Sequence, residues 1–369
     1  MLRCSFLFFV IPVVFLISFQ IYRSATLSLN LSLNADASDA RIPKAASNHN
    51  ENDTDVMPRI SFPSISWIQP NDLFLANNGT SLGGCESKFI LQHATTRQTF
   101  IFKPAHGAHE SLKGRYEFRP SKGGLVYLYK SHPPKILNEF VAFVANQILH
   151  LDRIPPVVPV ALNETFLHGL AMDAVENNKK KKSIWKCQMD FSSTSHWLRT
   201  QETSSSLPMI IGTLQLKINN VRAVSQWDMM FWNNRHRNHD VLSERELNTR
   251  TLFDYIVGNW DRGYSNNFVY NNTLVYIDQN ALRSNVVPFD LFQRLAGSKC
   301  RFYRTPIRQL QAKPDLASQI DRVLQPYTEK WKLPSPLGPL VHMNERVQAV
   351  LAYANGCVQA HGRSRVFSD

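Results

Sequence analysis

Three oxygen-bearing side chains follow one another in the second half of the chain. Asp261 comes just after an expected helix, Asn266 lies five residues later, and Asp278 ends the second strand of an expected hairpin. In phosphoryl transfer by protein kinases, such an Asp accepts the proton of the acceptor hydroxyl, while an Asn and a second Asp bind divalent cations. The alternative is a loop Asp that caps a helix and a second Asp in an ordinary turn.

A lysine and a glutamate in the first half favour the catalytic interpretation. Lys103 lies at the end of an expected strand, and Glu139 lies in the first turn of an expected helix. A kinase needs a strand Lys on the nucleotide phosphates and a helix Glu that holds this Lys. Each residue alone has an ordinary explanation, because strand-end lysines extend to solvent and first-turn glutamates favour the helix dipole. The order Lys, Glu, Asp, Asn, Asp along the chain indicates a kinase-type centre.

Hydrophobic patterns predict the elements that must position these side chains. Strands are expected at 88–92, 99–103, 125–129 and 210–218, and a hairpin at 268–270 and 273–277. A helix is expected over 137–149, where apolar residues recur at helical spacing. Ser243 and Glu246 form a capping box at the start of a second helix, which is expected to end near Gly258. Further helices are expected from about residue 291.

Composition narrows the class of protein. The chain has 369 residues, of which 43% are hydrophobic and 19% charged, which excludes a wholly disordered, collagen-like or coiled-coil protein. Forty-one basic against 29 acidic residues give a net charge of +12. Such an excess suits an acidic protein, a nucleotide, a nucleic acid or a glycosaminoglycan, and does not choose among them.

The N-terminus predicts the compartment. Residues 5–22 carry no charge and are flanked by Arg3 and Arg23. This length predicts a signal-anchor transmembrane helix behind a cytoplasmic tail at 1–4, with a cleaved signal peptide as the alternative. Residues 23–65 are polar and poor in large apolar side chains, which predicts a flexible lumenal stalk. A lumenal location makes nucleic acid an unexpected partner.

Sequons and cysteines agree with a secreted or lumenal protein. Five N-x-S/T sequons are present, and the glycosylation candidates in the expected globular part are Asn78, Asn163 and Asn271. Beyond the anchor region four cysteines remain: Cys85, Cys187, Cys300 and Cys357. An even count in an oxidising compartment predicts two disulfides with three possible connectivities, and the spacing is not that of a zinc site.

Several short motifs resemble the secretory-pathway kinases of the four-jointed and Golgi casein kinase family. The resemblance covers roughly residues 80–362 in islands, each of them short. The islands include Ile101-Phe102-Lys103-Pro104, Asn138 to Phe143, Arg153 to Pro156, Ile211 to Leu214, Leu252 to Tyr255, Gly258 to Arg262, Ser265 to Phe268, Lys299 to Arg304 and Gly356 to Val358.

The resemblance implies an α+β, two-lobed protein-kinase-like fold with a strand-rich N-lobe and a mainly helical C-lobe, behind the signal anchor. The kinase domain would span 66–369, with the N-lobe at about 66–174, a polar insert at 175–207 and the C-lobe at about 208–369. Implied as well are a Golgi membrane protein of type II topology, with secretion after cleavage as the alternative, and protein substrates that are secreted or exposed at the cell surface.

The resemblance also assigns roles. Lys103 would contact the phosphates of ATP, Glu139 would hold Lys103, Asp261 would be the catalytic Asp, and Asn266 and Asp278 would bind Mn²⁺ or Mg²⁺. The implied disulfides are Cys300–Cys357 and Cys85–Cys187.

The sequence departs from the family after Asp278, where Gln279-Asn280-Ala281 contains no Gly. A G-x-G-x-x-G loop is absent as well. Three interpretations therefore remain: a kinase for Ser/Thr hydroxyls, a kinase for glycan hydroxyls, and a pseudokinase that acts as a scaffold or allosteric partner.

Overall fold

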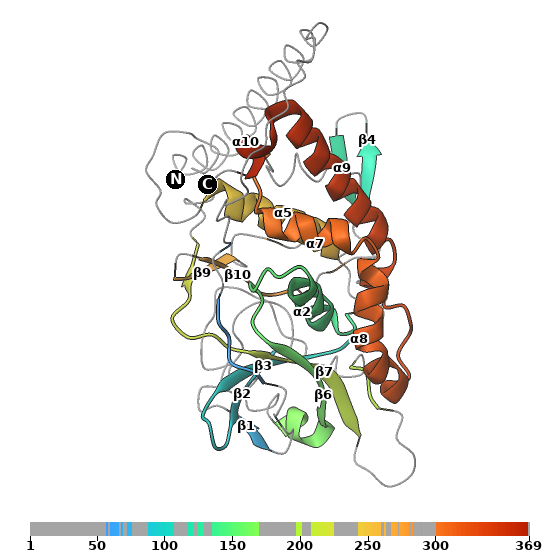
Figure 1. Cartoon of the computed structure of the whole chain (residues 1–369). Coiled ribbons are helices and arrows are strands. Elements are labelled where there is room, and N and C mark those ends of the chain that lie inside the picture. Colours follow the sequence, from blue (N-terminus) through green and yellow to red (C-terminus); the bar gives the residue numbers. More distant parts are fainter. Residues whose placement is uncertain are drawn as a thin grey trace, which may run out of the picture. The chain divides into compact units, whose positions relative to one another are not determined.

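The computed structural model describes a large part of the chain beyond residue 56 (Figure 1). The described residues are 57, 60–65, 68, 72–75, 88–106, 117–121, 124–128, 135–169, 197–200, 208–224, 243–259, 262, 267–271, 273–279, 282, 289 and 300–367. All of them belong to the unit Thr54–Asp369. Outside the described residues lie the expected anchor, most of the expected stalk and insert, Asp261, Asn266, Cys85, Cys187 and Asn78.

None of the helices in these described ranges has the length and apolarity needed to cross a membrane. Met57, Ile60 and Ile65, which precede the expected boundary at residue 66, are buried residues of this unit. Likewise, Trp197 of the expected polar insert is buried, and its backbone forms an isolated antiparallel β-bridge with that of His106. Apolar side chains at both places therefore pack onto the folded unit.

An antiparallel five-stranded sheet carries Lys103. Its order is β1 (Leu73–Leu75), β2 (Phe89–His93), β3 (Thr99–Pro104), β7 (Met209–Leu216) and β6 (Val157–Asn163). In β3, Phe100 and Phe102 are completely buried on one side of the strand, as the alternation predicts. The expected strands at 88–92, 99–103 and 210–218 are confirmed to within two residues at each end.

Two smaller sheets complete the strands. A pair joins β4 (Glu117–Ser121) to β5 (Gly124–Leu128), and β4 was not expected because its surroundings are polar and glycine-rich. A three-stranded sheet has the order β10 (Thr273–Tyr276), β9 (Asn267–Tyr270) and β8 (Arg222–Ala223). The predicted hairpin is confirmed, with Asn271 at φ 47° in the turn and Asp278 two residues beyond β10.

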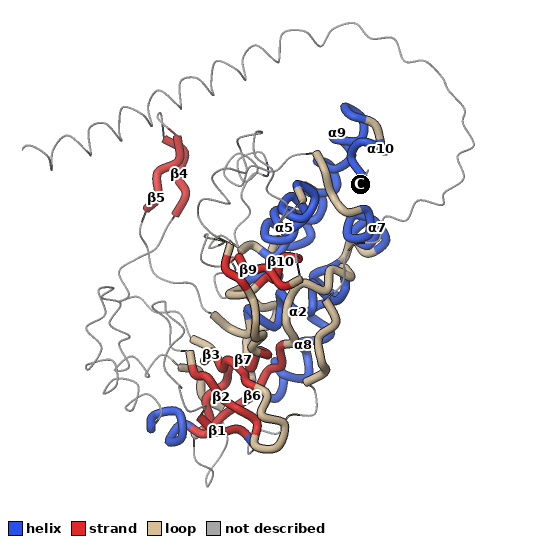
Figure 2. The backbone as a smooth tube through the Cα atoms, turned by 90° about the vertical axis from the view of Figure 1, so that its left-hand side faces the viewer, coloured by secondary structure: helices blue, strands red, loops and turns tan. Residues whose placement is uncertain are grey.

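Helices α2 (Asn138–Ile148) and α5 (Glu244–Val257) are the two strongest predictions, and both are confirmed. α2 contacts β6, β7, α5 and α8, so it lies between the five-stranded sheet and the helices (Figure 2). α5 begins at the predicted cap, where the Ser243 hydroxyl accepts a hydrogen bond from the Glu246 N–H at 3.1 Å. It ends at Gly258, whose φ of 75° suits glycine.

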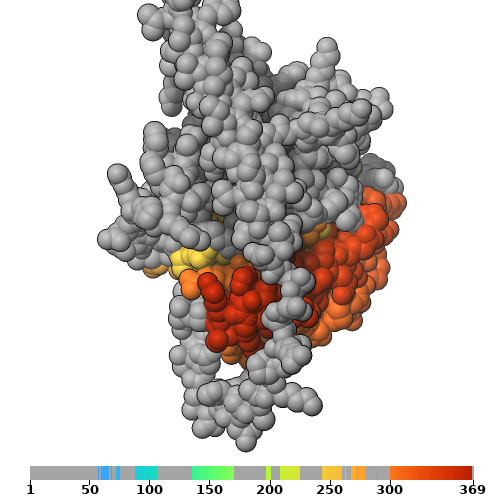
Figure 3. Space-filling view, turned by 90° about the horizontal axis from the view of Figure 1, so that it is seen from above, coloured from blue at the N-terminus to red at the C-terminus, as the bar shows by residue number. Residues whose placement is uncertain are grey.

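Further helices follow in the last part of the chain, as expected. They are α7 (Arg304–Ala312), α8 (Leu316–Trp331), the 3-10 turn η4 (Gly338–Leu340), α9 (Met343–His361) and α10 (Arg363–Phe367). Figure 3 shows the red C-terminal residues beside the orange residues of this region on one face. The predicted Cys300–Cys357 disulfide is present and ties the segment before α7 to α9.

A buried ion pair holds the segment after α2 against α5 and β10. The Arg153 guanidinium donates to both carboxylate oxygens of Glu246 in α5, at 2.7 and 3.0 Å. The same carboxylate accepts the backbone N–H of Leu274 in β10, and the Arg153 carbonyl accepts the N–H of Tyr276. The segment after α2, helix α5 and the strand that precedes Asp278 are therefore joined by buried groups.

Candidate active site

Lys103, Glu139 and Asp278 come together although 175 residues separate the first from the last. Lys103 from β3 forms a buried ion pair with Glu139, the second residue of α2. The Lys103 Nζ also lies 3.1 Å from Asp278 Oδ1. The structure thus joins three of the five predicted site residues, while Asp261 and Asn266 lie outside the described part.

Lys88 is a fourth member that the sequence analysis did not identify. Its Nζ lies 3.2 and 3.3 Å from the two carboxylate oxygens of Asp278. The β2–β3 register pairs Phe89 with Phe102, so Lys88 comes opposite Lys103. The expected strands at 88–92 and 99–103 held this signal, because pairing them across the short connection at residues 94–96 places the two lysines together.

The electrostatics of the site keep Asp278 ionised. Burial raises the pKa of its carboxyl, but the ammonium groups of Lys103 and Lys88 outweigh burial, and the pKa lies well below its usual range. Burial lowers the pKa of Lys103, yet Glu139 and Asp278 together raise it above its ordinary value. At neutral pH the site therefore presents an ammonium–carboxylate cluster.

The chain on both sides of Asp261 is firmly held. Asn259 donates its backbone N–H to the Asp254 carbonyl at 2.7 Å. Arg262 donates to the Asp254 carboxylate at 2.9 to 3.2 Å, and to the Ile277 carbonyl at 2.6 Å. Arg262 directly follows Asp261, and Ile277 directly precedes Asp278. This hydrogen bond therefore links the two segments that carry the aspartates.

Gly212 lets the Lys103 strand approach β7. A Cβ at this position would lie 2.5 Å from the Lys103 carbonyl oxygen and 2.6 Å from the ring of Phe102. Real Cβ contacts are essentially never shorter than 3.0 Å. Glycine is therefore required where β3 and β7 bring Pro104 opposite residue 212.

Oxygen ligands for a hard cation are available beside the lysines. The Glu139 Oε2 is buried and has no hydrogen-bond partner among the described residues, while its Oε1 accepts from Lys103 and from the Gln279 N–H. A buried carboxylate oxygen without a donor fits a cation, and Mn²⁺ and Mg²⁺ prefer oxygen. Within the described residues no group of three or more His, Cys, Asp or Glu forms a metal site by itself.

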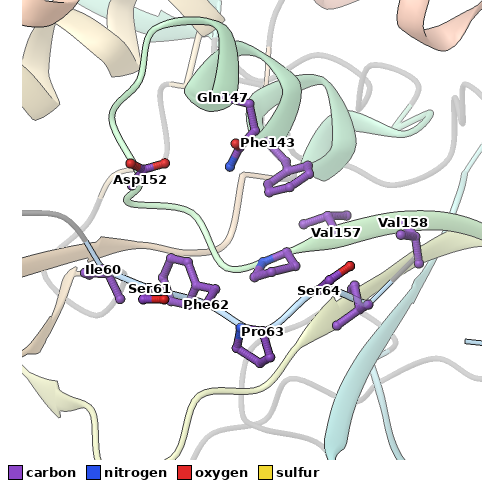
Figure 4. Close-up of a pocket in the computed structure, with 12 residues that line it drawn as sticks. Ile60, Ser61, Phe62, Pro63, Ser64, Phe143, Gln147, Asp152, Val157 and Val158 are labelled. Atoms are coloured by element: carbon purple, nitrogen blue, oxygen red, sulfur yellow. The ribbon is translucent and has the colours of Figure 1, made fainter. Parts of the chain in front are cut away.

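A cavity of about 500 Å³ lies apart from Lys103, Glu139 and Asp278 (Figure 4). It is bounded by the segment 60–65, by Phe143 and Gln147 of α2, by Asp152 and by residues 156–158. Its lining includes neither Lys103, Glu139 nor Asp278. It contacts α2 one and two turns after Glu139, and it is separate from the lysine–carboxylate cluster.

The glycosylation candidates that are described lie at accessible positions. Asn163 is the last, half-buried residue of β6, and Asn271 is exposed in the β9–β10 turn. Their modification stays a prediction.

The fold is kinase-like. The structure of Golgi casein kinase with Mn/ADP bound matches with a TM-score of 0.50 and 16% identity, covering 78% of this chain and 74% of that chain. A second Golgi casein kinase structure matches with a TM-score of 0.49 and 17% identity, again over 78% of this chain and 74% of that chain. The structure of hydra Fam20 with sugar matches with a TM-score of 0.48 and 16% identity, over 78% of this chain and 86% of that chain.

The kinase-like fold expected from the sequence motifs is thereby confirmed, while the expected signal anchor lies outside the described residues. No family model matches the chain, and no curated protein matches it in sequence. At these identities the comparison concerns the fold alone, so the activity has to be argued from the residues of the site.

Proposed function

We propose that the protein is a secretory-pathway kinase that transfers the γ-phosphate of ATP to Ser or Thr hydroxyls of secreted or cell-surface proteins. The observation that carries the proposal is the convergence of Lys103, Glu139 and Asp278 from three separate elements, with Lys88 beside them. A kinase needs these parts in this chain order.

Each residue has a defined task in this proposal. Lys103 and Lys88 bind the phosphates of ATP, and Glu139 keeps Lys103 in place. Asp278, Glu139 and Asn266 would hold Mn²⁺ or Mg²⁺, which when bound neutralises phosphate charge. Asp261 orients the acceptor hydroxyl and takes its proton. The cation Mn²⁺ is favoured because the Golgi casein kinase of the same fold has been solved with Mn/ADP.

The cellular location is proposed as the Golgi membrane, with the catalytic unit in the lumen behind a type II signal anchor. The uncharged stretch at 5–22 and the sequons support this location. The Cys300–Cys357 disulfide supports it as well, because disulfides persist in oxidising compartments.

Two observations bear on the pseudokinase alternative. The lysine–glutamate–aspartate cluster is assembled and charged, which favours activity. Gln279 replaces the residue that the family has after its metal-binding Asp, and this replacement is the observation that favours a scaffold.

A transfer assay separates the alternatives. The full chain, purified in glycosylated form, is incubated with γ-labelled ATP, Mn²⁺ or Mg²⁺, and a panel of secreted proteins and glycosaminoglycan-linker sugars. Label on Ser or Thr that is lost in Asp278→Ala, but kept in the surface control Asp321→Ala, supports the proposal. Label on sugars alone replaces the protein acceptor with a glycan hydroxyl. No transfer above Asp278→Ala from folded protein supports the pseudokinase.

A further inference from the structure

Gln279, which stands where the sequence departs from the family pattern, joins three parts of the site. Its backbone N–H donates to Glu139 Oε1 at 2.7 Å, and its side-chain Oε1 accepts from Asn259 Nδ2 at 2.7 Å. Both Gln279 and Glu139 are completely buried, and Asn259 is 1% exposed. One residue therefore touches α2 through its backbone and the segment after α5 through its side chain.

The two ends of this amide–amide bond stand next to the residues that carry the proposed chemistry. Asn259 lies two residues before Asp261, and Gln279 directly follows Asp278. Asn259 is itself anchored, because its backbone and side chain both donate to Asp254. The bond thus connects the segment of the proposed catalytic Asp to the segment of the proposed metal ligand.

The backbone at Asp278 needs such support. Its φ of 59° is left-handed, a conformation that is unfavourable for a non-glycine residue. Strained residues keep such a conformation only where the surrounding contacts hold them. The hydrogen bonds of Gln279 on one side, and of Arg262 to the Ile277 carbonyl on the other, enclose Asp278.

We infer that Gln279 is a positioning residue that, through Asn259 and Glu139, holds Asp278 ready to bind a metal–nucleotide complex before any ligand arrives. This inference rests on the proposed function for its consequence, and on the hydrogen bonds for its geometry. Directional bonds in a water-free environment resist rotation of the segment, because an amide left without its partner there is unfavourable. The site is thereby preorganised rather than assembled by the nucleotide.

Side-chain length provides the test. Because the Gln279 backbone is tied to Glu139, an Asn at position 279 ends one methylene short of Asn259, by roughly 1.5 Å on ordinary bond lengths. The double exchange Asn259→Gln with Gln279→Asn returns the missing methylene from the other side. Gln279→Met keeps length and approximate volume but removes the acceptor. Gln325→Asn changes the same amide on the exposed face of α8 and serves as the control.

Two readouts are taken on the full chain. In ligand-free protein, we measure amide hydrogen exchange of peptides covering 135–142 and 273–282. The exchange rate is expected to rise at least about tenfold in Gln279→Asn and Gln279→Met, because losing one buried hydrogen bond raises the equilibrium constant for local opening by about one order of magnitude. The double exchange and Gln325→Asn are expected to exchange as the wild type does. The affinity for Mn²⁺·ADP, measured by calorimetry, is expected to fall in the two Gln279 variants and to recover in the double exchange.

The outcomes separate the two proposals. Unchanged exchange in both Gln279 variants, or no recovery in the double exchange, overturns the positioning role. If wild-type protein binds no Mn²⁺·ADP, the proposed function fails, while the exchange measurement still decides whether Gln279 holds the segment. Faster exchange with unchanged Mn²⁺·ADP affinity also overturns the inference, because the positioning would then have no effect on ligand binding.

Discussion

Lys88 donates to both carboxylate oxygens of Asp278, which lies 190 residues further along the chain, at 3.2 and 3.3 Å. Lys88 directly precedes β2, and Asp278 follows β10, so the contact joins the five-stranded sheet to the three-stranded one. The proposed kinase centre consequently contains two lysines on one carboxylate, and each can be tested separately.

Lys88→Met is expected to weaken nucleotide binding more than catalysis. Loss of one ammonium from the phosphates raises the KM for ATP by about tenfold, since a hydrogen bond to a charged group contributes about 1.5 kcal/mol. Steady-state kinetics with varied ATP measure the effect, and Lys330→Met on the exposed side of α8 is the control. An unchanged KM for ATP would remove Lys88 from the nucleotide site.

Gly212→Ala is expected to destabilise the sheet at Lys103. The new methyl group would meet the Lys103 carbonyl and the Phe102 ring, and overpacking of this kind costs about 1–3 kcal/mol. Gly356→Ala is the matched control, because nothing lies within 4 Å of its added Cβ and α9 contains it. Thermal unfolding should show a lower Tm for the first variant and an equal or higher Tm for the second. Equal Tm values for Gly212→Ala and the wild type would contradict the packing of β3 on β7.

Stability should depend on pH through Asp278. Its pKa is lowered in the folded protein, so its ionised form stabilises the fold fully above the unfolded pKa of about 3.9 and loses this effect as the pH falls further. The difference in unfolding free energy between the wild type and Asp278→Asn is therefore expected to stay constant from about pH 6 to 8 and to shrink below about pH 4. Urea unfolding at several pH values measures it. A difference that grows on acidification would have the wrong sign for this ion-pair cluster.

Removing the Cys300–Cys357 disulfide should lower stability without touching the site. The two cysteines are 57 residues apart, and a loop of this length corresponds to about 4 kcal/mol in the chain-entropy description. Urea unfolding of Cys300→Ser/Cys357→Ser, compared with the wild type, measures the change. Mass spectrometry of the unreduced protein checks the pairing, and a Cys300 linked to any other cysteine would contradict the structure.

The local elements were predictable because their patterns are local. The β9–β10 hairpin follows from short apolar runs around Asn271, and the start of α5 follows from the Ser243–Glu246 capping box. These two elements deliver the residues around Asp261 and Asp278. Their short-range signals were therefore enough to propose the catalytic segment.

The contacts that complete the site were not predictable in the same way. The sequence suggests one apolar face for α5, yet residues 245–257 are all buried. Charged members of α5 are accommodated by partners outside the helix, as in Arg153–Glu246 and Arg262–Asp254. The Gln279–Glu139 bond spans 140 residues, and no local pattern specifies such a contact.

The most direct test of the metal–nucleotide site is the Mn²⁺ electron paramagnetic resonance signal of the full chain with ADP. Free Mn²⁺ gives a six-line signal that falls when the ion is bound. We predict that wild-type protein and Asp321→Asn reduce this signal below that of Mn²⁺ with ADP alone, and that Asp278→Asn does not. A signal that folded wild-type protein leaves unchanged, or that Asp278→Asn reduces equally, would contradict the assignment of Lys103, Glu139 and Asp278 to a kinase centre.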